Sequence, residues 1–105
     1  MRTFAAALIV VGCTLPADAE RFSQYWYDGN QLYELCQKSE ELVAGFSVAV
    51  AETAGHNLKA CISIGVQANQ IKDVVCRYLA DNPQTRQATG FNLAYSAIML
   101  AWPCP

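Results

Sequence analysis

The feature that most constrains the fold of this chain is its set of cysteines, because the number that remain depends on export. The sequence holds five cysteines. Cleavage after Ala19 would remove Cys13 and leave four, which are Cys36, Cys61, Cys76 and Cys104. An even number of cysteines in a small exported chain is typical of a disulfide framework, and sequence alone leaves three pairings open. One bridge with two thiols is the alternative, because Cys76 lies on an apolar helix face where a thiol packs like any small hydrophobe.

Residues 1–19 have the pattern of an export signal. A short positive start precedes an unbroken apolar run at 4–11 (FAAALIVV), and residues 17–19 offer a small-x-small cleavage site. The apolar run is far shorter than the ~20 residues that cross a bilayer, so we expect no transmembrane span. We predict a signal peptide at 1–19 and a mature domain at 20–105 in the bacterial periplasm or outside the cell. The alternative is that the run forms a short buried helix of the mature domain.

A second processing route is open at Cys13. Residues 10–13 (VVGC) resemble a bacterial lipobox, in which the cysteine is acylated and becomes the new N-terminus. Cys13 comes early for that role and Ala19 offers a good cleavage site, so we favour simple cleavage. A lipid anchor at Cys13 is the alternative localisation.

Composition favours one compact exported domain. Hydrophobic residues make up 53% of the chain and charged residues 15%, with a formal net charge of −2. No basic cluster is present, so nucleic acid is not an expected partner. A domain of this size has a limited core, and a disulfide typically adds ~2–4 kcal/mol to its stability.

The apolar spacing predicts a small all-α domain of four helices, stapled by disulfides. The first helix is expected to follow Asn30 as its N-cap, and the second to run from the cap Ser39 to Gly55, a natural C-terminal stop. Residues 46–51 (FSVAVA) would also fit a short strand, but the helix length and the flanking caps favour a helix. A loop is expected at 56–65.

The third helix has the clearest pattern, with apolar residues at the i, i+3, i+4, i+7 spacing: Ile71, Val74, Val75, Tyr78 and Leu79. Pro83 breaks this helix and suits the first turn of a fourth, which we expect from Pro83 to about Ala101. Gly90 would then lie inside the fourth helix and mark a close helix contact. Two apolar faces, one containing Phe91 and the other Leu100, would make this the central helix.

The residues offer little for catalysis or for holding a metal or cofactor. His56 is the only histidine, and a nucleophile pair of Cys61 with His56 is disfavoured because an exported cysteine is more often bridged. One histidine and scattered cysteines lack the paired spacing of zinc sites. We therefore predict no enzyme activity, no metal and no cofactor, and interpret the chain as a binding module.

Four ordered motifs give the chain a resemblance to a known family. They lie at 28–36 (DGNQLYELC), at 61–66 (CISIGV), from 70 through the proline break at 83, and at 102–104 (WPC). Together they resemble the Rap/Tai immunity family of type VI secretion amidase immunity proteins, over nearly the whole mature chain.

The resemblance implies an all-helical, commonly dimeric periplasmic protein that occludes the active-site cleft of a peptidoglycan amidase toxin. Within this interpretation the polar loop with His56, Asn57 and Lys59 is the expected contact surface, although it could simply connect two helices. The alternative function is a periplasmic structural or chaperone-like module with no toxin partner, for which the aromatic residues 25–27 would bind unfolded clients.

The chain departs from the family pattern at three positions. Val43 stands where the family often has a second cysteine, so the partner of Cys104 stays open, with Cys61 slightly ahead of Cys36. Ser63 replaces a loop proline. Gln67 replaces a capping threonine, which leaves Asn69 as the expected substitute cap.

Intact mass spectrometry of the exported protein tests these expectations in one measurement. We expect a chain that begins at Glu20 and whose mass rises on reduction by two hydrogen atoms for each of two bridges. A mass that corresponds to an acylated Cys13 at the N-terminus would contradict the predicted cleavage. No rise on reduction would contradict the disulfide framework.

Overall fold

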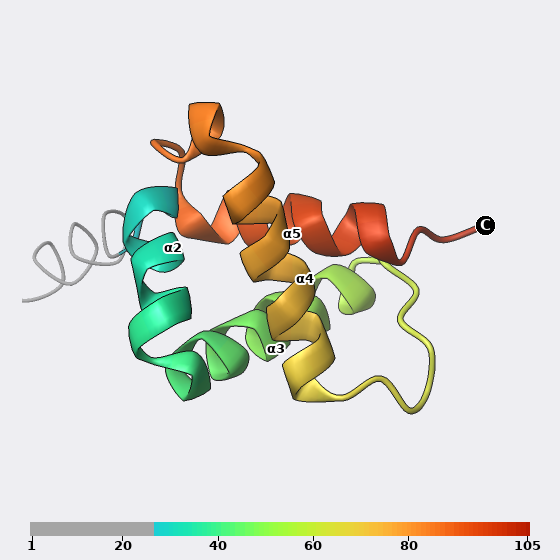
Figure 1. Ribbon diagram of the computed structural model, residues 1–105. Helices are drawn as coiled ribbons and strands as arrows, with labels where there is room; N and C mark the ends of the chain where they lie inside the picture. Colours follow the sequence, from blue (N-terminus) through green and yellow to red (C-terminus); the bar gives the residue numbers. More distant parts are fainter. Residues whose placement is uncertain (1–26) are drawn as a thin grey trace, which may run out of the picture.

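The computed structural model describes residues 27–105, which form four α-helices and one short 3₁₀ helix (Figure 1). They are α2 (Gly29–Lys38), α3 (Glu40–His56), α4 (Ala68–Asp81), η1 (Pro83–Thr85) and α5 (Gly90–Ala101). The predicted all-α class is confirmed, and residues 46–51 are helical. The predicted signal peptide, the cleavage site at Ala19 and Cys13 lie outside the described residues. Within 27–105, every helix is too short or too polar to cross a bilayer.

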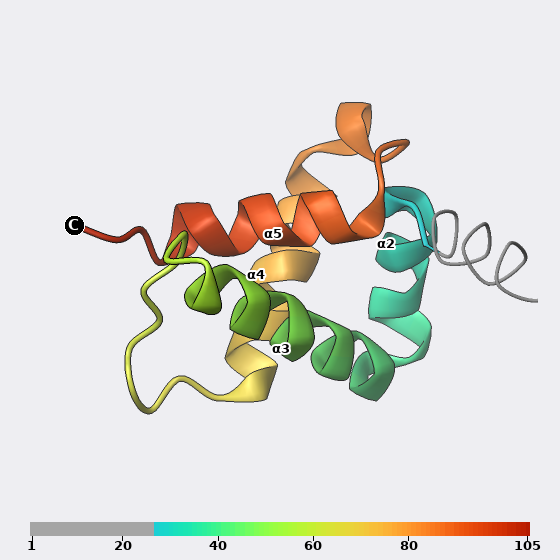
Figure 2. The ribbon, with the colours of Figure 1, turned by 180° about the vertical axis from the view of Figure 1, so that it is seen from behind.

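Two of the helices, α3 and α5, form a pair against which α4 and α2 pack. α3 and α5 run side by side in the same direction, so that their C-terminal ends meet at one end of the molecule (Figures 1 and 2). α4 crosses over both of them, and α2 packs beside their starts (Figure 1). The chain between α3 and α4 is an open loop at the end where α5 also finishes.

α2 begins two residues earlier than the sequence suggested. Its N-cap is Asp28, whose carboxylate accepts a hydrogen bond from the Gln31 backbone N–H at 2.8 Å, while the Gln31 side chain accepts from the Asp28 N–H at 3.0 Å. This capping box satisfies two backbone donors reciprocally. The prediction of Asn30 as the cap was wrong because Asn30 lies in the first turn of α2, where its backbone N–H donates to the Arg86 carbonyl at 2.9 Å.

The fourth helix was predicted from Pro83, but α5 begins at Gly90 behind the N-cap Thr89. The intervening residues hold the start of α2 instead. The N–H groups of Gly29 and Asn30 donate to carbonyls of this segment, and the Gly90 N–H donates to the Tyr27 carbonyl at 2.8 Å. Backbone committed to these long-range bonds cannot also form the local bonds of a helix.

Gly90 accordingly opens α5 rather than lying inside it. A close contact is present there, since a Cβ on Gly90 would lie 3.1 Å from the Tyr27 carbonyl oxygen. The contact is with the chain before α2 and with α2 itself, since the same Cβ would lie 3.3 Å from the Leu32 side chain. The predicted apolar faces are also only partly used, because Phe91 is 42% exposed and Leu100 is 70% exposed.

The N-terminal capping of α3 and α4 differs from the prediction. Ser39 occupies the predicted N-cap position of α3, but its side chain makes no capping hydrogen bond. α4 is capped at Gln67, whose backbone N–H donates to the Gln70 side chain at 2.8 Å. Asn69 was wrong as the cap because it lies within the first turn. At the other end of α3, the helix passes through the expected stop at Gly55 and includes His56.

The core lies where the four helices meet and is almost entirely aliphatic. Its larger members come from all four helices: Leu32, Val43, Val50, Ile71, Val75, Leu79, Leu93 and Ile98. Ser47 is the one buried polar residue of the described part, and its hydroxyl has no hydrogen-bond partner there.

Both predicted disulfides are present. Cys36–Cys76 joins α2 to α4 with a Cα–Cα distance of 6.0 Å, and both residues pack against the core. Cys61–Cys104 joins the α3–α4 loop to the C-terminal segment, with a Cα–Cα distance of 4.9 Å. The favoured pairing of Cys104 with Cys61 is thus confirmed, and Cys76 is bridged rather than a thiol.

Two glycine-to-alanine substitutions should have opposite effects. A Cβ on Gly29 would meet the Leu93 side chain and would lie 2.6 Å from the Arg86 carbonyl oxygen. We expect Gly29→Ala to destabilise the fold by ~1–3 kcal/mol through overpacking. At Gly45 a Cβ meets nothing within 4 Å, so Gly45→Ala should stabilise α3 by up to ~1 kcal/mol. Urea unfolding of both oxidised variants measures the difference, and a stabilised Gly29→Ala would contradict the packing described.

The two disulfides should differ in what their loss does to the structure. Their sequence separations, 40 and 43, imply entropic contributions that agree within ~0.1 kcal/mol in the loop-closure model. Any larger difference therefore reports on the folded state. We expect C36A/C76A to destabilise the whole domain more, because that bridge packs against the core.

The variant C61A/C104A should instead raise hydrogen exchange mainly in the loop and at the C-terminus. Amide hydrogen exchange measured by mass spectrometry compares the exchange rates of both variants, with the wild-type protein as control. Equal and global effects of the two variants would show that the Cys61–Cys104 bridge, the outer disulfide, is part of the cooperative core.

Candidate protein-interaction site

The α3–α4 loop, residues 57–67, is the longest segment of the described chain without regular structure. Its first turn folds back onto the end of α3, where the Lys59 N–H donates to the Ala54 carbonyl at 2.8 Å and the Ala60 N–H shares that acceptor at 3.3 Å. Cys61 then donates its N–H to the Trp102 carbonyl at 2.8 Å, beside the Cys61–Cys104 bridge. The start of the loop is therefore held to both α3 and α5.

Leu58 is the residue on which this turn reverses. Its φ of 61° lies in the left-handed region, which costs a non-glycine residue roughly 1–2 kcal/mol. Its side chain is 79% exposed, so no packing within 27–105 explains a leucine there. Sequence reasoning missed Leu58 because a leucine carries no signal for this conformation, and Gly55 was the more natural place for the helix to stop.

The three predicted contact residues lie around Leu58. His56 ends α3, and Asn57 and Lys59 flank the leucine in the turn; all three are exposed. The Asn57 amide donates to the Tyr95 hydroxyl at 3.3 Å, which ties the turn to α5. The structure thus brings the predicted residues together at one end of the molecule, beside the outer disulfide.

A second turn forms the tip of the loop. The Val66 N–H donates to the Ser63 carbonyl at 3.3 Å, and Gly65 has a φ of 101°, which a side chain would disfavour. Ile64 precedes Gly65 in this turn and is completely exposed. Its neighbours Ile62 and Val66 pack against the core. The loop therefore presents two apolar side chains, Leu58 and Ile64, on anchored backbone.

A recess of about 470 Å³ lies behind the loop. Its walls come from α3, from the start of the loop and from the first turn of α4, and it opens to solvent. The residues that line it are Val48, Ala51, Glu52, Gly55, Ala60, Cys61, Ile62 and Ile71. Seven of these residues are uncharged, so Glu52 is the only ionisable group in the lining. Sequence reasoning had no signal for this recess, because its walls come from separate segments.

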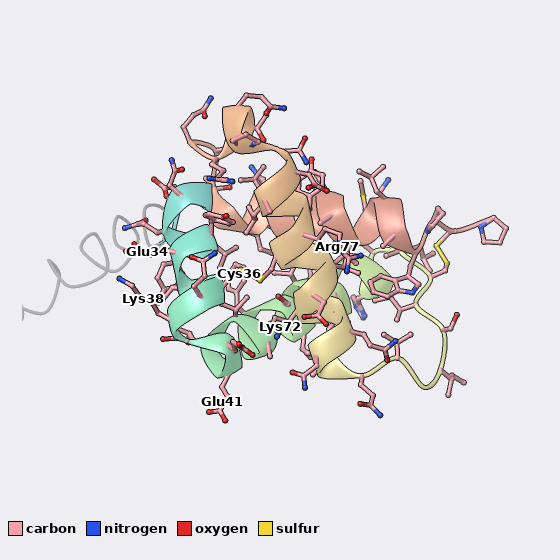
Figure 3. The ribbon with its side chains drawn as sticks, in the orientation of Figure 1. Glu34, Cys36, Lys38, Glu41, Lys72 and Arg77 are labelled. Atoms are coloured by element: carbon pink, nitrogen blue, oxygen red, sulfur yellow. A yellow bond between two sulfur atoms is a disulfide. The ribbon has the colours of Figure 1, made fainter. Side chains whose placement is uncertain are left out.

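The ion pairs lie on α2, at the start of α3 and on α4, away from the loop (Figure 3). Lys38 pairs with Glu34 at 2.9 Å, and Lys72 lies 3.2 Å from both Glu40 and Asp73. The hydrogen bond to Glu40, followed by that to Asp73, raises the pKa of Lys72 above its ordinary value. The Lys38–Glu34 pair is exposed on both sides and contributes little to stability. At the loop end, His56 and Lys59 carry the basic groups.

The described residues bring together no catalytic or metal-binding cluster. Cys61, the candidate nucleophile beside His56, is bonded to Cys104 and so has no thiolate to offer. Within 27–105, no group of three His, Cys, Asp or Glu side chains is placed to hold a metal ion. What this end of the molecule presents is a shaped surface: an anchored loop, exposed apolar side chains and a recess.

Comparison with known proteins gives one match. The family model of the Rap1a immunity proteins matches residues 28–104. No curated protein and no solved structure is significantly similar to the chain. The matched span begins at the N-cap of α2 and ends at the cysteine of the outer disulfide, so it includes every helix and both bridges described above. The chain belongs to the Rap1a immunity protein family.

Proposed function

We propose that this protein is a periplasmic, non-enzymatic inhibitor that binds a peptidoglycan-cleaving amidase toxin and blocks its active-site cleft. Membership of an immunity family implies a protein partner. Two disulfides fit an oxidising compartment outside the cytoplasm. The proposal also includes a periplasmic location, an export signal at 1–19 and an amidase as the partner.

The observation that carries the proposal is the anchored α3–α4 loop, which exposes the apolar side chains of Leu58 and Ile64. Binding a partner costs less entropy when the contact loop is already held in its bound shape. Here the turn is held by α3, by Tyr95 and by the outer disulfide, while Leu58 projects into solvent. A strained backbone that points an apolar side chain outward is a cost to the isolated protein, which a partner surface would offset.

The loop would contact the amidase together with the end of α5. A stable interface covers about 800 Å² on each partner, more than one loop can supply. Leu100 in the last turn of α5 is 70% exposed at the same end of the molecule (Figure 1). A homodimer would present two such ends to the toxin, and light scattering of the purified protein measures that state.

The direct test uses the mature oxidised protein and the amidase encoded beside its gene. We expect binding and loss of peptidoglycan hydrolysis, measured by calorimetry and by a turbidity assay. Leu58→Gly should weaken binding at least tenfold, yet leave stability unchanged or raised by ~1 kcal/mol, because glycine removes the strain. A structural role for Leu58 would instead lower stability.

The matched control is Leu42→Ser, which removes an exposed leucine (48%) from the first turns of α3. We expect the affinity of this variant to stay within twofold of wild type. Absence of both binding and inhibition by the wild-type protein would overturn the proposed function. Binding of many unfolded proteins without any effect on the amidase would support the chaperone-like alternative.

A further inference from the structure

We infer that the recess behind the α3–α4 loop binds a basic side chain of the partner, a lysine or an arginine, whose cation pairs with Glu52. This inference deepens the proposed function and rests on it for the identity of the partner. The chemistry of the recess itself stands on the residues that line it.

Most of the residues that line the recess have apolar side chains, which suits a methylene chain. Ala51, Ala60 and Ile71 belong to this lining and are buried. Small residues create the space: a Cβ on Gly55 would find only the Ala60 carbonyl, at 3.9 Å. Lysine and arginine bury their aliphatic stems on such surfaces while keeping the charged group near water.

The charge at the rim selects a cation. Glu52 is exposed on α3, and its carboxylate makes no ion pair or hydrogen bond within residues 27–105. His56 follows it by one helical turn, yet the two side chains form no ion pair in the described structure. A carboxylate with no internal partner, beside apolar side chains, is complementary to an ammonium or guanidinium group on an apolar stem.

The rim of the recess is held in place, which favours a specific ligand. Cys61 belongs to the lining and is anchored by its disulfide and by the hydrogen bond to Trp102. The far wall is the first turn of α4, whose start is capped by Gln70. One basic side chain fills only part of about 470 Å³, so the remaining space fits an apolar neighbour in the same partner segment.

The recess can be tested without the toxin. In a nuclear magnetic resonance titration of the mature oxidised protein, n-butylammonium and n-propylguanidinium should shift the amide signals of Gly55, Ala60 and Ile62. Butyrate has the propyl stem of n-propylguanidinium with the opposite charge and should bind at least tenfold more weakly. The two cations together show whether an ammonium or a guanidinium group is preferred.

Substitutions separate charge from shape. Glu52→Gln keeps the size of the side chain and should weaken binding of both cations at least tenfold. Gly55→Leu should abolish binding by filling the recess. Glu41→Gln, at the opposite end of α3, should change the affinity less than twofold, and thermal unfolding verifies that all three variants are folded. Equal binding of butyrate, no response in the recess, or an unaffected Glu52→Gln would each overturn the inference.

The amidase supplies the second test. Glu52→Lys should weaken toxin binding at least tenfold, whereas Glu41→Lys should stay within twofold of wild type. Equal affinity of wild type and Glu52→Lys would overturn the inference and leave the proposed function standing. If the wild-type protein binds no amidase, the proposed function fails, and the titration with small cations alone decides the chemistry of the recess.

Discussion

The contacts of Arg86 join two of the helices, α2 and α4, through the segment that precedes α5. Its guanidinium donates to the Leu79 carbonyl at 2.7 Å, at the C-terminal end of α4, and lies over the Tyr33 ring of α2 at 3.7 Å. Its own carbonyl accepts the Asn30 N–H at the start of α2. A cation suits a helix C-terminus, and hydrogen bonds to charged groups are each worth about 1.5–3 kcal/mol. The turn around Arg86 therefore sets where α2 and α5 begin.

The opposite end of the molecule is built by a covalent constraint instead. At the end of the molecule that contains Arg86, the helices are joined by hydrogen bonds. At the end that contains the α3–α4 loop, the Cys61–Cys104 bridge joins that loop to the C-terminal segment outside the core. A covalent link holds the loop without burying apolar surface, so Leu58 and Ile64 stay in solvent and the recess stays open. A surface of this kind suits a protein whose family acts through protein partners.

The parts that could be predicted from sequence are those with local causes. Helix periodicity located α4, the break at Pro83 follows from proline geometry, and the position of Ser39 marked the start of α3. The misplaced starts of α2 and α5 share one cause. Backbone groups of Asn30, Arg86 and Gly90 bind across the fold, and long-range hydrogen bonds leave no trace in local spacing.

For this protein, the sequence by itself determined the helical class, a set of four cysteines suited to a disulfide framework, the family motifs and the presence of a loop after the second predicted helix. Only the tertiary structure decided which cysteines pair, where α5 begins, and that Leu58 turns outward beside a recess with one carboxylate. The physical reason is that periodicity and capping act within a few residues. Pairing, strain and concavity arise between segments that only the folded chain brings together.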